Sequence, residues 1–205
     1  MPDDISYARA RAVLSLVDLG EWEVLIDPIA EELAMIYASG MAGAAGLAEY
    51  DIDLDQANEQ AAEWARERAA ELVQGIEENT REMLADETAT AIESGASVDE
   101  LAEEIASSTG FSADRAAMIA RTETIRSLNQ GELRIYKDSG VVEMVEWMTA
   151  GDDLVSEDCQ ENEDEGPIAL GEDFPSGDDA PPAHPNCRCA LAPVFAPAEE
   201  AEEEG

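Results

Sequence analysis

The chain has 205 residues, enough for one large or two small domains with a hydrophobic core. Its 49 acidic residues face only 11 basic ones, which gives a net charge of −38. Because there is no basic stripe to displace counterions from a phosphate backbone, this charge argues against direct, sequence-specific binding of nucleic acid.

The acidic residues are spread through every segment, and lysine occurs once, at Lys137. Such a surface repels itself in dilute buffer, because the Debye length is about 10 Å at 0.1 M salt and shrinks to about 3 Å only at 1 M. We therefore interpret the composition as that of a protein from an extreme halophile or its virus. The alternative is an acidic effector that binds a basic partner or mimics DNA, which would concentrate its acids on one face.

The N-terminal half is predicted to be helical. Apolar spacing predicts a short helix over residues 4–19, followed by Gly20 as a stop. Asp27 and Pro28 are typical of an N-cap and the first turn of the next helix. The uncharged run 33–48 falls short of the ~20 apolar residues of a membrane span, so we interpret it as a core or helix-pairing segment and expect no membrane association.

Residues 51–55 resemble the first half of a calcium loop, but Gln56 and Ala62 stand where such a loop needs glycine and glutamate. We expect a helix-capping turn there instead. The pattern from 55 to 93 is strongly helical, and a helix of that length spans roughly 55–60 Å, so it must break near Gly75 or form an elongated spacer. Its expected apolar stripe comprises Ala57, Ala61, Trp64, Leu72, Ile76, Met83, Leu84 and Ile92.

Two further helices are predicted before the period of the sequence changes. A capping box at 97–100 opens a short helix that Gly110 ends, and Ser112 caps a longer one over 113–138. The longer helix contains Gly131, which costs about 1 kcal/mol relative to alanine, so a packing or hydrogen-bonding need is expected there. Its polar residues form either a network under the following strand or a solvated face; they are Arg121, Glu123 and Asn129.

Residues 141–149 alternate with period two and predict an antiparallel strand, whose expected partner is 190–195. Between them lies a long loop, 151–182, with twelve acidic residues and no basic one. The predicted fold class is α+β, with an elongated N-terminal helical region and a small C-terminal domain of helix plus antiparallel strands around this acidic loop. The tail 197–205 is expected to be disordered.

All three cysteines and the one histidine lie in the last quarter of the chain. Two residues separate His184 from Cys187, and one separates Cys187 from Cys189, so the two cysteines share a face of an extended strand. With Cys159 from across the acidic loop, these side chains offer three thiolates and one imidazole, a plausible ligand set for one tetrahedral, structural zinc. Such a metal would also organise the long loop.

Two other interpretations of these residues stay open. They can be small buried apolar thiols with an unrelated histidine, or they can form a disulfide, although the odd count and the lack of any signal-peptide pattern favour this less. An open catalytic zinc is not expected, because no histidine is left over to act as a general base.

Several short motifs accompany the cysteines: Ala120-Arg121-Thr122-Glu123, Asn129, Gly131, Trp147-Met148-Thr149-Ala150, Asp152, Asp153, Val155, and Pro181-Pro182-Ala183-His184-Pro185-Asn186-Cys187-Arg188-Cys189. Through them residues 112–194 resemble the C-terminal domain of the phage Mu F-like head morphogenesis family, the minor capsid proteins of tailed viruses. The final string is the most specific. Many family members carry a second cysteine where this chain has Ser156, so a four-ligand site requires His184 as a ligand.

The periodicity predicts a helical arm over 1–110, the resemblance implies a Mu F-like domain over 111–196, and the composition predicts an acidic tail over 197–205. The resemblance also implies a virion protein at the portal vertex, in multiple copies, with the portal protein and other head proteins as partners. Head assembly, genome packaging or DNA ejection would be its roles, and the host cytoplasm its location during assembly. Together with the composition, this points to a haloarchaeal tailed virus.

Two alternatives to a structural head protein remain. One is a toxin-like enzyme of the ADP-ribosyltransferase kind, with Arg121 and Glu123, or Glu143 and Glu146, as its polar set. Glu143 and Glu146 fall on opposite faces of the predicted strand, and the chain has no glycine-rich phosphate loop or HExxH helix, so we expect no enzyme. The other is an acidic binding module of the host that engages a basic partner.

Overall fold

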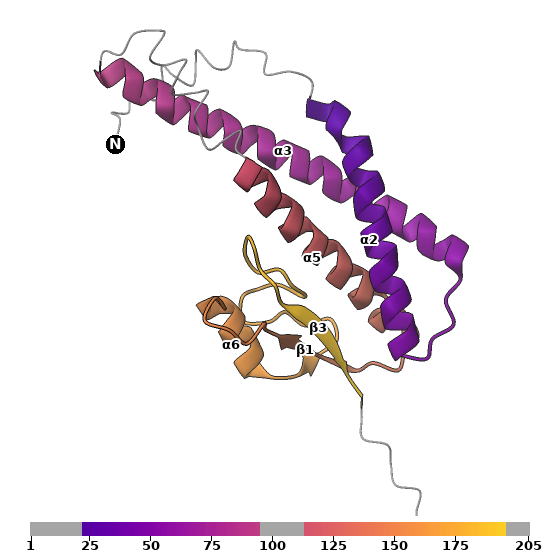
Figure 1. Ribbon diagram of the computed structural model, residues 1–205. Coiled ribbons are helices and arrows are strands. Elements are labelled where there is room, and N and C mark those ends of the chain that lie inside the picture. Colours follow the sequence, from indigo (N-terminus) through magenta and orange to yellow (C-terminus); the bar gives the residue numbers. More distant parts are fainter. Residues whose placement is uncertain (1–21, 95–112, 196–205) are drawn as a thin grey trace, which may run out of the picture. The chain divides into compact units, whose positions relative to one another are not determined.

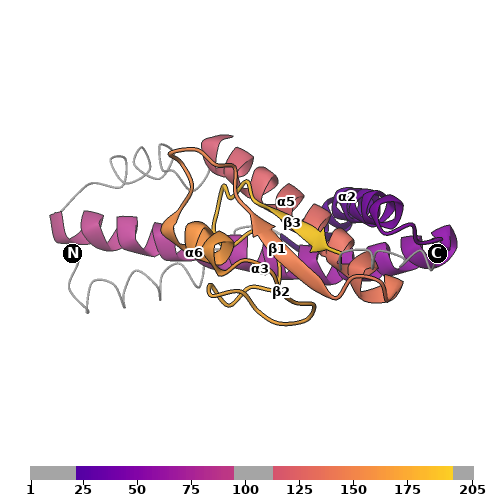
Figure 2. The same ribbon diagram turned by 90° about the horizontal axis from the view of Figure 1, so that it is seen from below.

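The computed structural model describes residues 22–94 and 113–195. It confirms the predicted α+β class: helices make up the N-terminal part, and a small C-terminal part combines a helix with a three-stranded antiparallel sheet (Figures 1 and 2). The predicted elements at 4–19, 97–110 and 197–205 lie outside the described residues. In chain order the elements are η1 (Trp22–Leu25), α2 (Ile26–Leu47), α3 (Leu54–Ser94), α5 (Ala113–Ser139), β1 (Met144–Met148), α6 (Glu157–Glu165), β2 (Ile168–Ala169) and β3 (Ala190–Val194).

The contacts divide the chain into two units, which are described separately. The first consists of Met1–Glu32 and Glu63–Ala120, and the second of Leu33–Ala62 and Arg121–Gly205. The cysteines, the histidine and the sheet all belong to the second unit. The domain boundaries expected from the sequence stay a prediction.

Helix α2 does not begin as the sequence predicts. A 3-10 turn, η1, leads directly into α2 at Ile26, so Asp27 is already helical and is not the N-cap. The Asp27 carboxylate instead accepts a hydrogen bond from Arg66 at 2.6 Å. Both side chains of this ion pair are exposed, so it contributes little to stability.

Helix α3 is a single unbroken element of 41 residues, about 60 Å long at 1.5 Å per residue. It passes through Gly75 without a break, so the elongated form of the prediction holds. The capping turn is confirmed, because Asp53 Oδ1 accepts the backbone N–H groups of Asp55 and Gln56 at 3.0 and 3.1 Å. The buried face of α3 includes three residues of the expected stripe, Ala57, Ala61 and Leu84. It also runs through small residues outside that stripe, among them Ala65, Ala69 and Val73.

In the second unit, α2 and α5 pack backbone against backbone at two glycines. A Cβ atom added to Gly40 would overlap the carbonyl oxygen of Leu128, and one added to Gly131 would overlap that of Tyr37. Only glycine allows this approach, which accounts for Gly131 in a helix interior. The run 33–48 therefore pairs helices, as expected. Among the described residues, no helix is both long and apolar enough to span a membrane.

The sheet has β1 at its centre, antiparallel to β2 on one side and β3 on the other. Trp147 lies opposite Leu191 and Val145 opposite Ile168, and all four side chains are buried on one face. The predicted pairing of 141–149 with 190–195 is confirmed, although β1 is shorter than expected. Its ladder starts at Met144, opposite the last residue of β3.

The acidic stretch between the strands contains a helix, α6, that the sequence analysis did not identify. Ser156 is its N-cap, accepting the backbone N–H of Cys159 at 3.2 Å, and Gly166, with φ 74°, closes it. Thr149 joins the end of β1 to α6, because its backbone N–H and its hydroxyl both donate to the Glu163 carboxylate at 2.9 Å. These bonds tie the last turn of α6 to the end of β1.

Candidate metal centre

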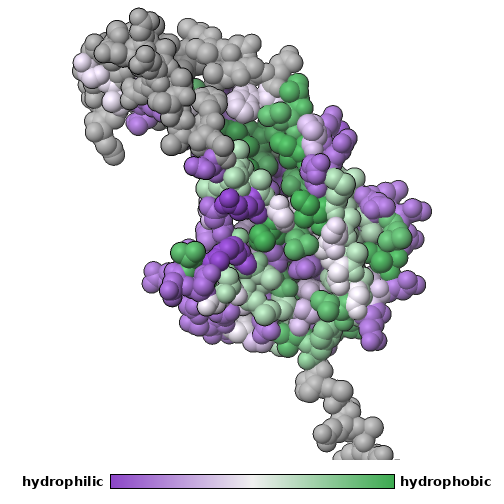
Figure 3. Space-filling view, viewed as in Figure 1, coloured by the Kyte–Doolittle hydropathy of each residue, from purple (hydrophilic) through white to green (hydrophobic). Residues whose placement is uncertain are grey.

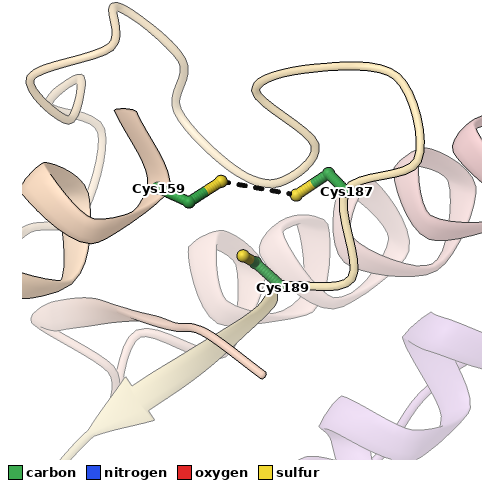
Figure 4. A group of neighbouring side chains, drawn as sticks. All are labelled: Cys159, Cys187 and Cys189. Atoms are coloured by element: carbon green, nitrogen blue, oxygen red, sulfur yellow. Dashed lines mark hydrogen bonds between the residues drawn. The ribbon is translucent and has the colours of Figure 1, made fainter. Parts of the chain in front are cut away.

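Three buried sulfur atoms meet where α6 approaches the start of β3. Cys159 is in the first turn of α6, Cys187 is in the turn before β3, and Cys189 directly precedes that strand. Their side chains point toward one another in Figure 4, and their Sγ atoms lie within 4.8 Å of one another. Exposed fractions of 0%, 2% and 4% show that water reaches none of them freely. All three are free thiols.

The spacing of the sulfur atoms fits a shared ion. Two sulfurs bound to one tetrahedral zinc at about 2.3 Å each stand roughly 3.8 Å apart. The Sγ atoms of Cys159 and Cys187 are 3.7 Å apart. Beside Cys159 and Cys189 lies a cavity of about 10 Å³, the size of a single small occupant. The cluster can therefore hold a metal ion such as zinc.

The three thiols affect one another's pKa values. The thiol of Cys189 hydrogen-bonds to Cys187, which lowers the pKa of Cys187 despite its burial. The same bond, together with burial, raises the pKa of Cys189, and burial raises the pKa of Cys159. A buried thiol whose pKa is raised becomes a thiolate more readily when a bound cation compensates for its charge, as is usual for thiolate ligands of a divalent metal.

Each sulfur also has its own hydrogen-bond donors, which counteract the desolvation. The hydrogen bond from the Ser156 hydroxyl partly offsets the effect of burial on the pKa of Cys159. Backbone N–H groups, including that of Ala183, add to the lowering of the pKa of Cys187. The Trp147 indole partly offsets the rise in the pKa of Cys189. Donors around the ligands are what a metal-thiolate site requires. Ser156 thus both caps α6 and donates to the Cys159 sulfur.

The indole N–H of Trp147 is buried and has no completed hydrogen bond. It is directed at the Cys189 sulfur and partly offsets the rise in the pKa of that thiol, but it falls short of full hydrogen-bond geometry, since a neutral thiol is a weak acceptor. A buried donor without a partner costs about 1–3 kcal/mol, so it calls for an explanation. A sulfur that carries negative charge supplies one, and this fits a bound cation.

His184 lies beside the cluster but is not one of its three mutually close members. Its imidazole is half-buried and lines the same cavity as Cys159 and Cys189. Nδ1 lies 2.8 Å from the carbonyl oxygen of Pro185, so the proton sits on Nδ1 and the lone pair on Nε2. This is the tautomer that a ligating histidine adopts when its other nitrogen donates to a backbone carbonyl.

Asn129 fixes the strand that carries Cys189. It is 1% exposed on α5, its Oδ1 accepts the N–H of Leu191 at 2.7 Å, and its Nδ2 donates to the carbonyl of Cys189 at 3.5 Å. The side-chain amide therefore acts as a partner for the free edge of β3. Asn129 is therefore not part of a solvated face, but the strand that it holds is β3 and not β1, the strand that follows α5.

Two residues of α5, Arg121 and Thr122, hold the turn that precedes Cys187. The Thr122 hydroxyl accepts the backbone N–H of Asn186 at 3.0 Å, and Arg121 donates to the Asn186 side chain at 3.2 Å. Asn186 adopts φ 61°, the left-handed conformation that asparagine tolerates well. These contacts give Arg121 and Thr122 a positioning role.

A second tie joins the cysteine turn to the loop after β1. Arg188 donates to both carboxylate oxygens of Asp152, at 2.6 and 2.7 Å. The guanidinium, together with the backbone N–H of Leu154, lowers the pKa of Asp152 to about 2. Asp153, next in the chain, is exposed.

The remaining predicted residues lie apart from the sulfur cluster. Gly131 is at the crossing of α2 and α5, and Glu123 is 5% exposed with its carboxylate 3.7 Å from Arg126. Within residues 22–94 and 113–195, the three cysteines are the one group of three or more cysteine, histidine or acidic side chains whose ligand atoms are in mutual reach. The acidic residues considered for the enzyme alternative form no such group; they are Glu123, Glu143 and Glu146.

The family described as Phage Mu protein F like protein matches residues 82–192, more than half of the chain. The chain belongs to this family. The match includes all three cysteines, His184, the strands β1 and β2, and the first part of β3. Comparison with curated proteins and with solved structures gave no match. The Phage Mu F-like family consists of generally structural head proteins, which assigns this member to viral head morphogenesis in general terms and implies a virion protein with head proteins as partners.

Proposed function

We propose that this Phage Mu F-like protein is a minor head protein at the portal vertex of a tailed virus. Several copies surround the portal and contact it and other head proteins, and they serve head assembly and genome packaging or ejection. Before assembly the protein resides in the host cytoplasm. The family match over residues 82–192 is the observation that carries this proposal.

The helical part supplies the contact surface in this proposal. Helix α3 is long and unbroken, and its residues before position 82 precede the matched range. A segment that lies outside the range matched by the family is suited to a partner that itself differs from virus to virus. The acidic surface, without a basic stripe, supports protein contacts rather than contacts with the packaged DNA.

Cryo-EM of mature and immature particles tests the location. We expect density for the chain in several copies beside the portal in at least one particle form, and peptides of the chain in the mass spectrum of purified particles. Absence of the chain from both particle forms would overturn the proposal. Density spread over the whole shell would instead support a capsid role away from the portal.

We further propose that Cys159, Cys187, Cys189 and His184 hold a structural zinc. The bound ion would compensate the charge of three buried thiolates, and the four side chains would fill all its positions. His184 Nε2 supplies the fourth ligand, which the substitution of Ser156 for cysteine makes necessary. The site fastens α6 to the start of β3, so its role is to hold the acidic loop in place.

Elemental analysis of protein purified in high salt tests the site. We expect one zinc per chain in the wild type, less than a tenth of that in Cys189→Ser, and the wild-type amount in Asp153→Asn, an exposed change in the neighbouring loop. Wild-type protein that contains no metal, and that takes up none when refolded with zinc, would refute the site. A His184→Ala variant that keeps tight binding would remove His184 from the ligand set.

A further inference from the structure

The indole of Trp147 and the sulfur of Cys189 share one face of the sheet. In the antiparallel pair of β1 and β3, Trp147 lies opposite Leu191, and Cys189 is two residues before Leu191, so the two side chains are diagonal neighbours. Diagonal neighbours on a sheet are within reach of an aromatic side chain. The register of the sheet therefore brings the indole to this sulfur.

The indole of Trp147 is buried, and its N–H makes no other hydrogen bond within the described residues. Trp147 is 2% exposed, and its ring meets that of Phe174 edge-on, with ring centres 5.1 Å apart. Phe174 offers no acceptor in the ring plane, and the indole N–H has no hydrogen-bond partner. A tryptophan is usually buried with its N–H bonded, whereas phenylalanine would fill an apolar site without that requirement.

We propose that Trp147 is a positioning residue of the metal centre, and that its Nε1–H donates a hydrogen bond to the metal-bound thiolate of Cys189. This inference rests on the proposed zinc site. The other two sulfurs have donors in Ser156 and in backbone N–H groups, and Trp147 completes the set for the third. The hydrogen bond withdraws charge from the thiolate and fixes the orientation of Cys189.

The test compares Trp147→Phe with Trp22→Phe. The Trp147 change keeps an aromatic ring in the core and removes the N–H. Trp22 is the matched control, because its indole N–H is also buried without a partner but belongs to η1, outside the cysteine cluster. Cobalt(II), which occupies tetrahedral thiolate sites, gives a visible spectrum and a sulfur-to-metal charge-transfer band. Competition with a chromophoric chelator gives the zinc affinity.

We expect Trp147→Phe to bind zinc about 10-fold more weakly, since loss of an outer-shell partner typically costs 10- to 100-fold in affinity. Its cobalt charge-transfer band should move to lower energy, because a thiolate that accepts no hydrogen bond is the stronger electron donor. Trp22→Phe should match the wild type in both measurements. Equal affinity and an unshifted band in Trp147→Phe, alongside a wild type that binds metal, would overturn this inference and leave the zinc site intact.

A measurement on the wild type removes any dependence on the folding of the variant. In a proton–nitrogen correlation spectrum, the Trp147 indole resonance should move downfield on zinc addition, while that of Trp22 stays in place. A Trp147 resonance that does not respond to bound zinc contradicts the hydrogen bond. Absence of zinc binding by the wild type removes the proposed site itself, and with it this inference, so the two failures are distinguishable.

Discussion

Asn129 is the residue that links helix packing to the metal centre. It extends from α5 to the edge of β3, next to Cys189, and satisfies a buried N–H group that no strand covers. Two residues further along β3, Pro193 has no N–H to leave exposed. The edge is thus closed by one amide and one proline, which protects it from pairing with other chains.

Replacement of Asn129 by alanine should lower the free energy of unfolding by about 2–3 kcal/mol, because it leaves the buried Leu191 N–H without an acceptor. Gln130→Ala is the control: its side chain donates to Asp179 in a half-buried position, so its loss should cost under about 1 kcal/mol. Denaturant unfolding at constant high salt measures both. Equal effects of the two changes would contradict the role assigned to Asn129.

Glu132 gives a residue-scale prediction for pH. Burial raises its pKa to about 7, above the ordinary value of 4.5 for a glutamate, so the folded protein binds this proton more tightly than the unfolded chain. Stability contributed by the protonated form is therefore complete below pH 4.5 and is lost progressively as the pH rises to about 7.

Glu132→Gln should be more stable than the wild type at pH 8 by about 1–2 kcal/mol, a figure reduced from the full shift because the side chain is only half-buried. The difference should vanish near pH 4.5. Thermal unfolding at the two pH values measures it. A difference that does not change with pH would show that Glu132 titrates normally.

At the scale of elements, the sequence predicted those whose inward-facing residues are apolar. The helices α3 and α5 and the pairing of β1 with β3 follow from period and turn residues. Helix α6 was missed because its two buried residues, Cys159 and Asn162, are polar or small, so the acidic segment shows no apolar stripe. The buried face of α3 was predicted only in part, because several of its buried residues are alanines, which indicate close packing only once a neighbour is known.

The candidate site was also predictable only in part. Scarcity and clustering singled out the cysteines, and the chain brings their sulfurs together. The role of the Trp147 N–H depends on which residue lies opposite Leu191, and that register is not encoded in any local motif. Likewise, the backbone N–H groups that donate to Thr122 and Asn129 belong to residues more than 60 positions away along the chain.

Gly131→Ala tests the crossing of α2 and α5. The added methyl group would overlap the backbone of α2 at Tyr37, so we expect a loss of about 1–3 kcal/mol in the free energy of unfolding. Gly43→Ala on α2 is the control, since it meets no atom within 4 Å and should stabilise the helix by up to about 1 kcal/mol. A neutral or stabilising Gly131→Ala would contradict the close approach.

At the scale of the whole molecule, the main feature is the large excess of acidic side chains. Acidic side chains are exposed on α2, α3, α5 and α6, and hydrophilic residues gather in more than one place on the face drawn in Figure 3. This distribution supports adaptation to concentrated salt over a single acidic binding face. Repulsion among charges that sum to −38 is screened only when the Debye length falls to a few ångströms.

We expect circular dichroism to show a folded protein in multimolar KCl that loses helix signal as the salt is diluted below about 0.5 M, where the Debye length exceeds roughly 4 Å. An uncharged osmolyte at the same osmolality should not substitute for the salt, because it does not screen charge. Full helix content in dilute buffer would contradict the halophilic interpretation.

X-ray absorption at the zinc edge of the full chain, purified in high salt, tests most directly whether the cysteine cluster is a metal centre. The account predicts three sulfur neighbours at about 2.3 Å and one nitrogen at about 2.0 Å. A metal surrounded only by oxygen and nitrogen, or a wild-type protein that holds no zinc at all, would contradict it.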